Sequence, residues 1–121
     1  MAAEDLVKGS CVPCRGGMPT LEDSEIAELK PHLPGWQVVE VDGIKRLMRE
    51  FHFNDFREAM EFAVKVGDLA EREGHHPDLH VAWGKVTVET WTHKIKGLHR
   101  NDFILAANVD AIHAGNREVG G

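Results

Sequence analysis

The sequence contains no tyrosine and has two cysteines among its 121 residues. No apolar run comes close to the roughly 20 residues that a helix needs to cross a bilayer, and the N-terminus has neither a basic start nor an apolar segment behind it. We therefore expect a protein that does not enter a membrane and that lies in the cytoplasm. The hydrophobic share of 42% and the charged share of 28% are ordinary for globular domains, so we expect one compact core without disulfide support.

Positive charge is also scarce. The chain has 14 basic and 20 acidic side chains, which gives a formal net charge of -6 at pH 7. A protein with this balance has no general electrostatic attraction to phosphate backbones or anionic lipid. We expect neither direct nucleic-acid binding nor membrane association.

The two cysteines, Cys11 and Cys14, form a Cys-x-x-Cys pair in a stretch rich in glycine and proline. Residues 1–19 are interpreted as an N-terminal arm, residues 20–114 as the domain, and residues 115–121 as a flexible tail. A Cys-x-x-Cys pair can be half of a structural zinc site or a redox pair. A structurally modest arm is the favoured interpretation, because nothing before Cys11 resembles the strand that precedes a redox pair.

The hydrophobic pattern predicts the order helix, two strands, helix, two strands, helix. The first helix follows Thr20 as its N-cap, and the last covers residues 101–113. The middle helix follows Asn54 and ends at Gly74, because Pro77 cannot continue it. The apolar stripe predicted for this helix consists of Phe56, Met60, Ala63, Val64, Gly67 and Ala70, widened by Phe62, Val66 and Leu69.

Two hairpins are predicted. The first joins residues 36–41 to residues 44–53 around Asp42-Gly43, a dipeptide favoured in two-residue turns. The second joins residues 79–83 to residues 86–92 around Gly84-Lys85, where a first-position glycine suits a type II′ turn. The fold class that follows is α+β: a single domain with a four-stranded antiparallel sheet and helices packed on one face.

Eight histidines in 121 residues are the clearest chemical signal. In the second hairpin as predicted, Trp83 lies opposite Val86, and His76 lies opposite His93. Directly opposed residues have Cβ atoms about 4.5–5.5 Å apart, so both imidazoles could touch one small ligand. His75 precedes His76 at the turn and can reach the same place.

Two carboxylates can orient these rings. Glu71 lies four residues before His75, which is one helical turn away, and Asp102 lies near the start of the last helix. A carboxylate partner fixes the tautomer of a histidine. The cluster therefore offers acid, base and orienting roles near neutral pH, whereas no serine or cysteine nucleophile has an evident histidine partner.

Two other interpretations stay open. His75 and His76 could serve only as a polar helix cap. His75, His76 and His93 could instead hold a metal ion, although Pro77 prevents His76 and His80 from forming the i, i+4 zinc pair of a helix. Metal binding is the less favoured interpretation, and no metal is predicted.

One run of residues resembles the signature of the pterin-4a-carbinolamine dehydratase family. Its fixed positions are Glu71, His75, His76, Pro77, Trp83, His93 and Asp102. Gly35-Trp36 and the aromatic-rich run of residues 51–56 are also similar to the family, and the likeness covers residues 21–112. The Cys-x-x-Cys arm resembles that of some bacterial members.

The resemblance implies a hydro-lyase that converts 4a-hydroxytetrahydrobiopterin to quinonoid dihydrobiopterin and water, in tetrahydrobiopterin recycling. It implies no cofactor, and it implies His75, His76 and His93 as the catalytic residues. The substrate-binding residues that it implies are Gly74, Trp91, Thr92 and Lys94, with Glu71 and Asp102 as orienting residues. One departure from the family is His99, which stands where a serine or threonine helix cap is expected.

The family also suggests partners. Its members form homodimers or homotetramers, so a homo-oligomer is expected beside the small-molecule pterin substrate. Some animal members act as dimerisation cofactors for a homeodomain transcription factor. The alternative function is therefore a non-catalytic dimerisation or transcriptional co-regulator module.

Overall fold

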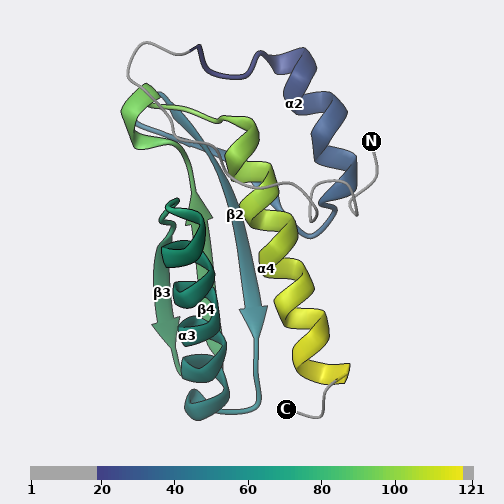
Figure 1. Ribbon diagram of the computed structural model, residues 1–121, viewed down its shortest axis with the longest axis vertical. Helices are drawn as coiled ribbons and strands as arrows, with labels where there is room; N and C mark the ends of the chain where they lie inside the picture. The colour runs from purple at the N-terminus through teal and green to yellow at the C-terminus, as the bar shows by residue number, and fades with distance from the viewer. Residues whose placement is uncertain (1–18, 119–121) are drawn as a thin grey trace.

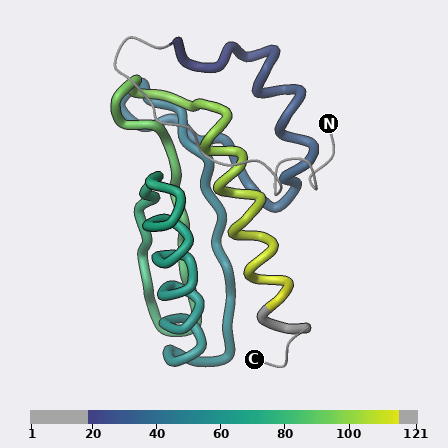
Figure 2. The backbone as a smooth tube through the Cα atoms, in the orientation of Figure 1, coloured from purple at the N-terminus to yellow at the C-terminus, as the bar shows by residue number. Residues whose placement is uncertain are grey.

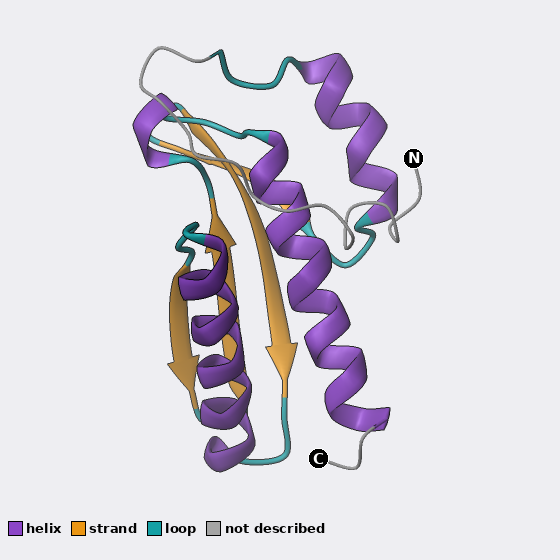
Figure 3. Ribbon diagram, viewed as in Figure 1, coloured by secondary structure: helices purple, strands orange, loops and turns teal. Residues whose placement is uncertain are grey.

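The computed structural model describes residues 19–118. Cys11 and Cys14, and residues 119–121 of the predicted tail, lie outside the described residues, so the division of the chain into arm, domain and tail stays a prediction. The described part is an α+β domain with one four-stranded antiparallel sheet in the order β1-β2-β4-β3. Helices α3 (Phe56–Glu73) and α4 (Arg100–Glu118) lie side by side against one face of this sheet, as Figures 1 and 3 show. The predicted fold class is confirmed.

The first helix, α2 (Asp23–Leu29), begins later than predicted. Its N-cap is Glu22 and not Thr20, and Glu22 forms a reciprocal capping box with Glu25. A short 3-10 helix, η1 (Lys30–His32), continues from it. The α2 side chains that reach the core are Ile26 and Leu29, whereas the predicted cap at Thr20 is wrong.

The first hairpin matches its prediction. Strands β1 (Gln37–Val41) and β2 (Ile44–His52) pair with Val41 opposite Ile44, which leaves Asp42-Gly43 as the loop. Both loop residues have positive φ, 53° and 77°. This is the requirement of a type I′ turn, which explains why the Asp-Gly pair is so informative in the sequence.

Helix α3 begins one residue later than predicted and turns a different side towards the core. Its N-cap is Asp55, whose side chain accepts a hydrogen bond from the Glu58 N–H at 2.8 Å, and not Asn54. The buried side chains of α3 are Ala59, Phe62, Ala63, Val66, Leu69 and Ala70. Three members of the predicted stripe are exposed instead, namely Phe56 at 48%, Met60 at 41% and Val64 at 57%.

The error in the predicted face has a physical cause. Two adjacent sides of α3 are apolar, and helical periodicity alone cannot say which side meets the sheet. The structure places the residues that had only widened the predicted stripe, such as Phe62 and Val66, in the core. The end of the helix at Gly74 is confirmed, because Gly74 has the left-handed φ of 66° that favours glycine.

The second hairpin has a different register from the predicted one. Strands β3 (Asp78–Ala82) and β4 (Lys85–Thr90) pair with Val81 opposite Val86, so the loop is Trp83-Gly84 and not Gly84-Lys85. Tertiary contact favours this register. Gly84 has a φ of 67°, its carbonyl accepts a hydrogen bond from the Phe53 N–H at 2.8 Å, and a Cβ atom there would meet the Phe53 carbonyl oxygen at 2.9 Å.

This register removes the predicted opposition of His76 and His93. Strand β4 ends at Thr90, and His93 begins a separate 3-10 helix, η2 (His93–Ile95). The two histidines are therefore not a cross-strand pair. The end of α3 and the start of β3 lie near mid-height in Figure 2, below η2 and the start of α4, and the side chain of His75 reaches Asp102 of α4.

The core lies between the sheet and the helices. Its largest fully buried side chains include Trp36, Phe51, Phe62 and Phe103. Helix α4 extends to Glu118, five residues beyond the predicted end at His113. Across the described residues, no helix is long and apolar enough to span a bilayer.

Candidate active site

The centre of the candidate site is Asp102, in the first turn of α4. Its side chain is 0% exposed, yet both carboxylate oxygens have partners. Oδ1 accepts hydrogen bonds from the Thr90 hydroxyl at 2.7 Å and from His75 Nε2 at 2.6 Å. Oδ2 accepts from the Thr92 hydroxyl at 2.9 Å and from the His99 N–H at 3.0 Å. A buried carboxylate is costly unless it is hydrogen-bonded, and four donors meet that requirement here.

The start of α4 favours a negative charge at Asp102. The first turn of a helix presents unpaired N–H groups and the positive end of the helix dipole. His99 lies just before α4, and its Nδ1 accepts the Asn101 N–H at 3.0 Å, while the Asp102 carboxylate accepts the His99 N–H. This is a reciprocal arrangement like a capping box, with histidine in the place of serine or threonine. His99 therefore caps α4 despite its departure from the expected residue type.

His75 is held at this carboxylate by the end of α3. The N–H groups of Gly74 and His75 both donate to the Ala70 carbonyl, which ends the helix. The His75 side chain is 10% exposed. Because an ionised carboxylate only accepts hydrogen bonds, His75 Nε2 carries the hydrogen, and Nδ1 has the free lone pair. Asp102 can thus stabilise the imidazolium that forms when Nδ1 takes a proton.

The second carboxylate pairs differently from the prediction. Glu71 Oε2 lies 2.5 Å from His76 Nε2, and not beside His75. This pair is open to solvent, since the side chains of His76 and Glu71 are 60% and 78% exposed. The sequence spacing correctly suggested that Glu71 reaches the histidine pair. The prediction that Glu71 contacts His75 is wrong. Helix α3 ends before Gly74, so the four-residue spacing no longer places His75 one helical turn above Glu71.

His93 lies against Trp91. Their ring centroids are 4.4 Å apart, and the Arg46 guanidinium lies 3.8 Å from the Trp91 ring centroid. His93 is exposed and directly follows Thr92, which is bonded to Asp102. Each of the three predicted catalytic histidines thus has its own neighbour: Asp102 for His75, Glu71 for His76, and Trp91 for His93.

The predicted substrate-binding residues are neighbours of these histidines in the chain. Gly74 and Lys94 are exposed, and Trp91 is half-buried. Thr92 is 3% exposed, its hydroxyl donates to Asp102, and its N–H donates to the Gly97 carbonyl at 2.9 Å. The polar groups of Thr92 are therefore already engaged within the protein.

Two residues of the network were missed from the sequence. One is Thr90, at the end of β4. A signal for it existed, because Thr90 shares the core-facing side of β4 with Val86 and Val88, where a hydroxyl needs a partner. The other is His99, whose capping role is not apparent from its residue type.

The described residues contain no group of three or more histidine, cysteine, aspartate or glutamate side chains placed to hold a metal ion. The histidine and carboxylate contacts at this end of the molecule are instead pairwise. The chemistry available to these residues is proton transfer and hydrogen bonding to a polar ligand.

Known sequences similar to this chain share one family description. The family model described as pterin 4 alpha carbinolamine dehydratase matches residues 19–112. A protein of Gloeobacter violaceus, provisionally named pterin-4-alpha-carbinolamine dehydratase 1, is 53% identical over 91% of this chain and 95% of its own. A relative in Syntrophotalea carbinolica, provisionally named pterin-4-alpha-carbinolamine dehydratase, is 52% identical over 90% of this chain and 97% of its own.

A solved structure has the same fold. The crystal structure of a transcriptional coactivator/pterin dehydratase from Brucella melitensis superposes with a TM-score of 0.70 and 35% sequence identity. The match covers 78% of this chain and 98% of that one.

Proposed function

Because the chain belongs to the pterin 4 alpha carbinolamine dehydratase family, we propose that it dehydrates 4a-hydroxytetrahydrobiopterin to quinonoid dihydrobiopterin and water. The activity would serve tetrahydrobiopterin recycling in the cytoplasm. Family membership supports the substrate class, and the buried pairing of His75 with Asp102 is the single structural observation that carries the chemistry.

The reaction requires two proton transfers. The bond between C4a and the hydroxyl oxygen breaks, a proton joins the departing oxygen to give water, and N5 loses its proton as the bond between C4a and N5 becomes double. The site must therefore hold a proton donor within reach of the hydroxyl oxygen and a proton acceptor within reach of N5. Histidine serves both roles near neutral pH.

His75, His76 and His93 share this acid and base work in the proposal. His75 is the best supported, because Asp102 fixes its tautomer and leaves Nδ1 available. His76 has Glu71 as its carboxylate partner, and His93 lies beside Trp91. Gly74 and Lys94 are assigned to substrate binding, as the family resemblance implies, whereas Thr92 is assigned to supporting Asp102, because its hydroxyl is already bonded there.

The test is the removal of two of the three rings. In the double variant H75A/H93A, enzyme-dependent dehydration of freshly made 4a-hydroxytetrahydrobiopterin should fall by roughly 100-fold or more, the scale of general acid–base catalysis. Stopped-flow absorbance gives the rate, and circular dichroism checks the fold. Full activity in a folded double variant would reject the proposal.

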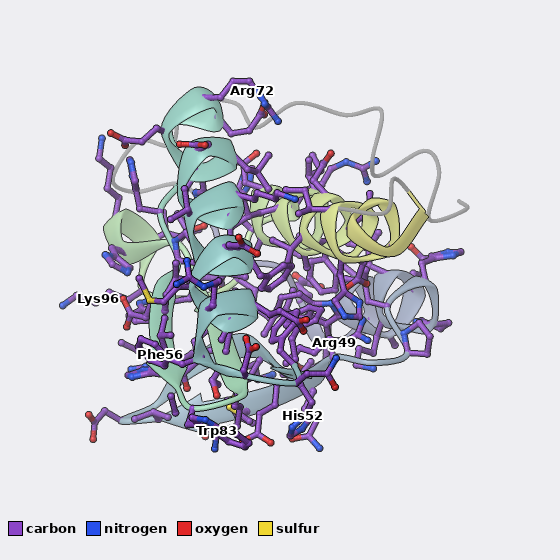
Figure 4. All side chains as sticks on the ribbon, turned by 90° about the horizontal axis from the view of Figure 1, so that it is seen from below. Arg49, His52, Phe56, Arg72, Trp83 and Lys96 are labelled. Carbon is purple, nitrogen blue, oxygen red and sulfur yellow. The ribbon has the colours of Figure 1, made fainter. Side chains whose placement is uncertain are left out.

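His52 provides a matched control. It is exposed at the end of β2, at the opposite end of the molecule from His75, and is labelled in Figure 4. The variant H52A removes an imidazole and leaves the hydrogen bonds of Asp102 with His75, Thr90, Thr92 and His99 unchanged. It should dehydrate the substrate at the rate of the unaltered protein.

A second candidate function has its own support. The apolar side of α3 is exposed at Phe56, Met60 and Val64, and the Brucella melitensis relative carries the description of a transcriptional coactivator beside that of a dehydratase. A non-catalytic dimerisation or co-regulator module would use such a surface. Partner capture that persists in the inactive H75A/H93A variant, together with a lack of dehydration by the unaltered protein, would favour it.

A further inference from the structure

Thr90 places a hydroxyl group on the core-facing side of β4, where most side chains are apolar. It is the last residue of β4, is 0% exposed, and shares its side of the strand with Val86 and Val88. An apolar side chain would be the usual occupant of such a site. The Thr90 hydroxyl instead donates to Asp102 Oδ1 at 2.7 Å.

The oxygen that Thr90 contacts is the one that also accepts from His75. Asp102 Oδ1 receives both hydrogen bonds, whereas Oδ2 receives those of Thr92 and the His99 N–H. Thr90 and His75 therefore meet at a single atom. Any shift of that atom changes the direction of the hydrogen bond that fixes the His75 ring.

Thr90 is also well suited to hold an atom still. A threonine is β-branched and has few accessible χ1 rotamers. Its backbone is fixed by the sheet, where it pairs with Leu47 of β2. Asp102 belongs to a helix and His75 to a loop, so Thr90 connects the sheet to both.

From this geometry we propose that Thr90 is a positioning residue, which fixes Asp102 Oδ1 and thereby the orientation of the His75 ring. The assignment rests on the proposed dehydratase function for its effect on rate, but its effect on the His75 ring does not depend on that function. Thr90 is fully buried, so it has no direct contact with a substrate.

The experiment compares T90V with T90S. Valine keeps the shape of threonine and removes the hydroxyl, whereas serine keeps the hydroxyl and removes the methyl group. In T90V, kcat should fall roughly tenfold with little change in KM, by analogy with the hydrogen-bonded partners of metal-binding histidines, whose loss typically costs 10- to 100-fold. T90S should recover most of this loss, and T90A serves as the variant without the hydroxyl if T90V does not fold.

Thr87 supplies the matched control on the same strand. It lies on the opposite side of β4 from Thr90 and is half-buried, so T87V makes the same chemical change away from Asp102. T87V should keep the kcat of the unaltered protein. Equal losses in T87V and T90V would overturn the assignment.

A second measurement separates this inference from the proposed function. Nitrogen-15 NMR of the His75 ring, recorded without substrate, should show the same signal for the Nε2–H that is hydrogen-bonded to Asp102 in the unaltered protein and in T90S, and a shifted or exchange-broadened signal in T90V. An unchanged His75 ring in T90V overturns the inference even if dehydration is observed. If neither the unaltered protein nor any variant dehydrates the pterin, the proposed function is wrong. The NMR signal of the His75 ring still tests the role of Thr90 in that case.

Discussion

At the scale of single residues, two aspartates on α4 show how environment sets the behaviour of one side chain. Asp102 lies in the first turn and is surrounded by four hydrogen-bond donors. Asp110 lies two turns later, and its Oδ1 accepts from Trp36 Nε1 at 2.9 Å and from Arg49 Nη1 at 2.8 Å. Arg49, labelled in Figure 4, connects β2 to this second carboxylate.

Burial raises the pKa of Asp110 above its ordinary value of 3.8, and it outweighs the hydrogen bond from Trp36 and the charges of Arg49 and His113, which lower that pKa. The folded protein therefore holds this proton more tightly than the unfolded chain does. Between the two pKa values the folded state binds more protons at Asp110, so the contribution of Asp110 to the free energy of unfolding should fall as pH rises from 3.8 through the raised pKa.

The variant D110N isolates this effect, because asparagine does not titrate in the range. The free energy of unfolding of the unaltered protein minus that of D110N should decrease as pH rises through this window and then become constant. Urea unfolding at a series of pH values measures both quantities. A difference that increases with pH would contradict the raised pKa.

At the scale of secondary-structure elements, the ends of the helices depend on single hydrogen bonds. Helix α3 begins at the Asp55 side chain, which accepts the Glu58 N–H. The neighbouring Asn54 has a residue type that caps helices equally well. The position of the chain after β2, where Phe53 is tied to Gly84, decides between them.

Substituting Asp55 should therefore cost more stability than substituting Asn54. The variant D55A should lose about 1 kcal/mol of unfolding free energy, the usual value of an N-cap. N54A is the matched control and should lose less than about 0.5 kcal/mol, as surface substitutions do. Urea unfolding would show equal losses if the cap were not at Asp55.

At the scale of the whole molecule, the exposed apolar side of α3 is a surface that a second copy of the chain could cover. Phe56, Met60 and Val64 follow one another at helical spacing, and Phe56 is labelled in Figure 4. Oppositely charged residues flank this side, with Arg57 near one end and Asp68 near the other. Two copies of α3 packed antiparallel would place Arg57 of one copy near Asp68 of the other.

We therefore expect the homo-oligomer suggested by the family to use this side of α3. V64E places a charge in the middle of the contact and should shift the protein towards smaller species in analytical ultracentrifugation. A27E adds the same charge to an exposed alanine on α2 and should leave the mass unchanged. Identical masses for V64E and the unaltered protein across a concentration series would place the contact elsewhere.

Features that depend on local chemistry could be predicted from the order of the residues alone. The Asp42-Gly43 turn and the end of α3 at Gly74 could be predicted because each needs a positive φ at a named residue. The α+β class followed from the alternation of periodicities. The candidate residues His75, His76 and His93 were found through their types and spacing, and their catalytic roles stay predictions.

Features that depend on contacts between distant segments could not be predicted in this way. Asp102, and not Glu71, contacts His75 across 27 positions of sequence. The Phe53–Gly84 contact set the register of β3 and β4, and the packing of the sheet chose which apolar side of α3 became the core. Periodicity and residue type describe one segment at a time, whereas hydrogen bonds and burial are properties of pairs of segments, so these outcomes were fixed only when the chain came together.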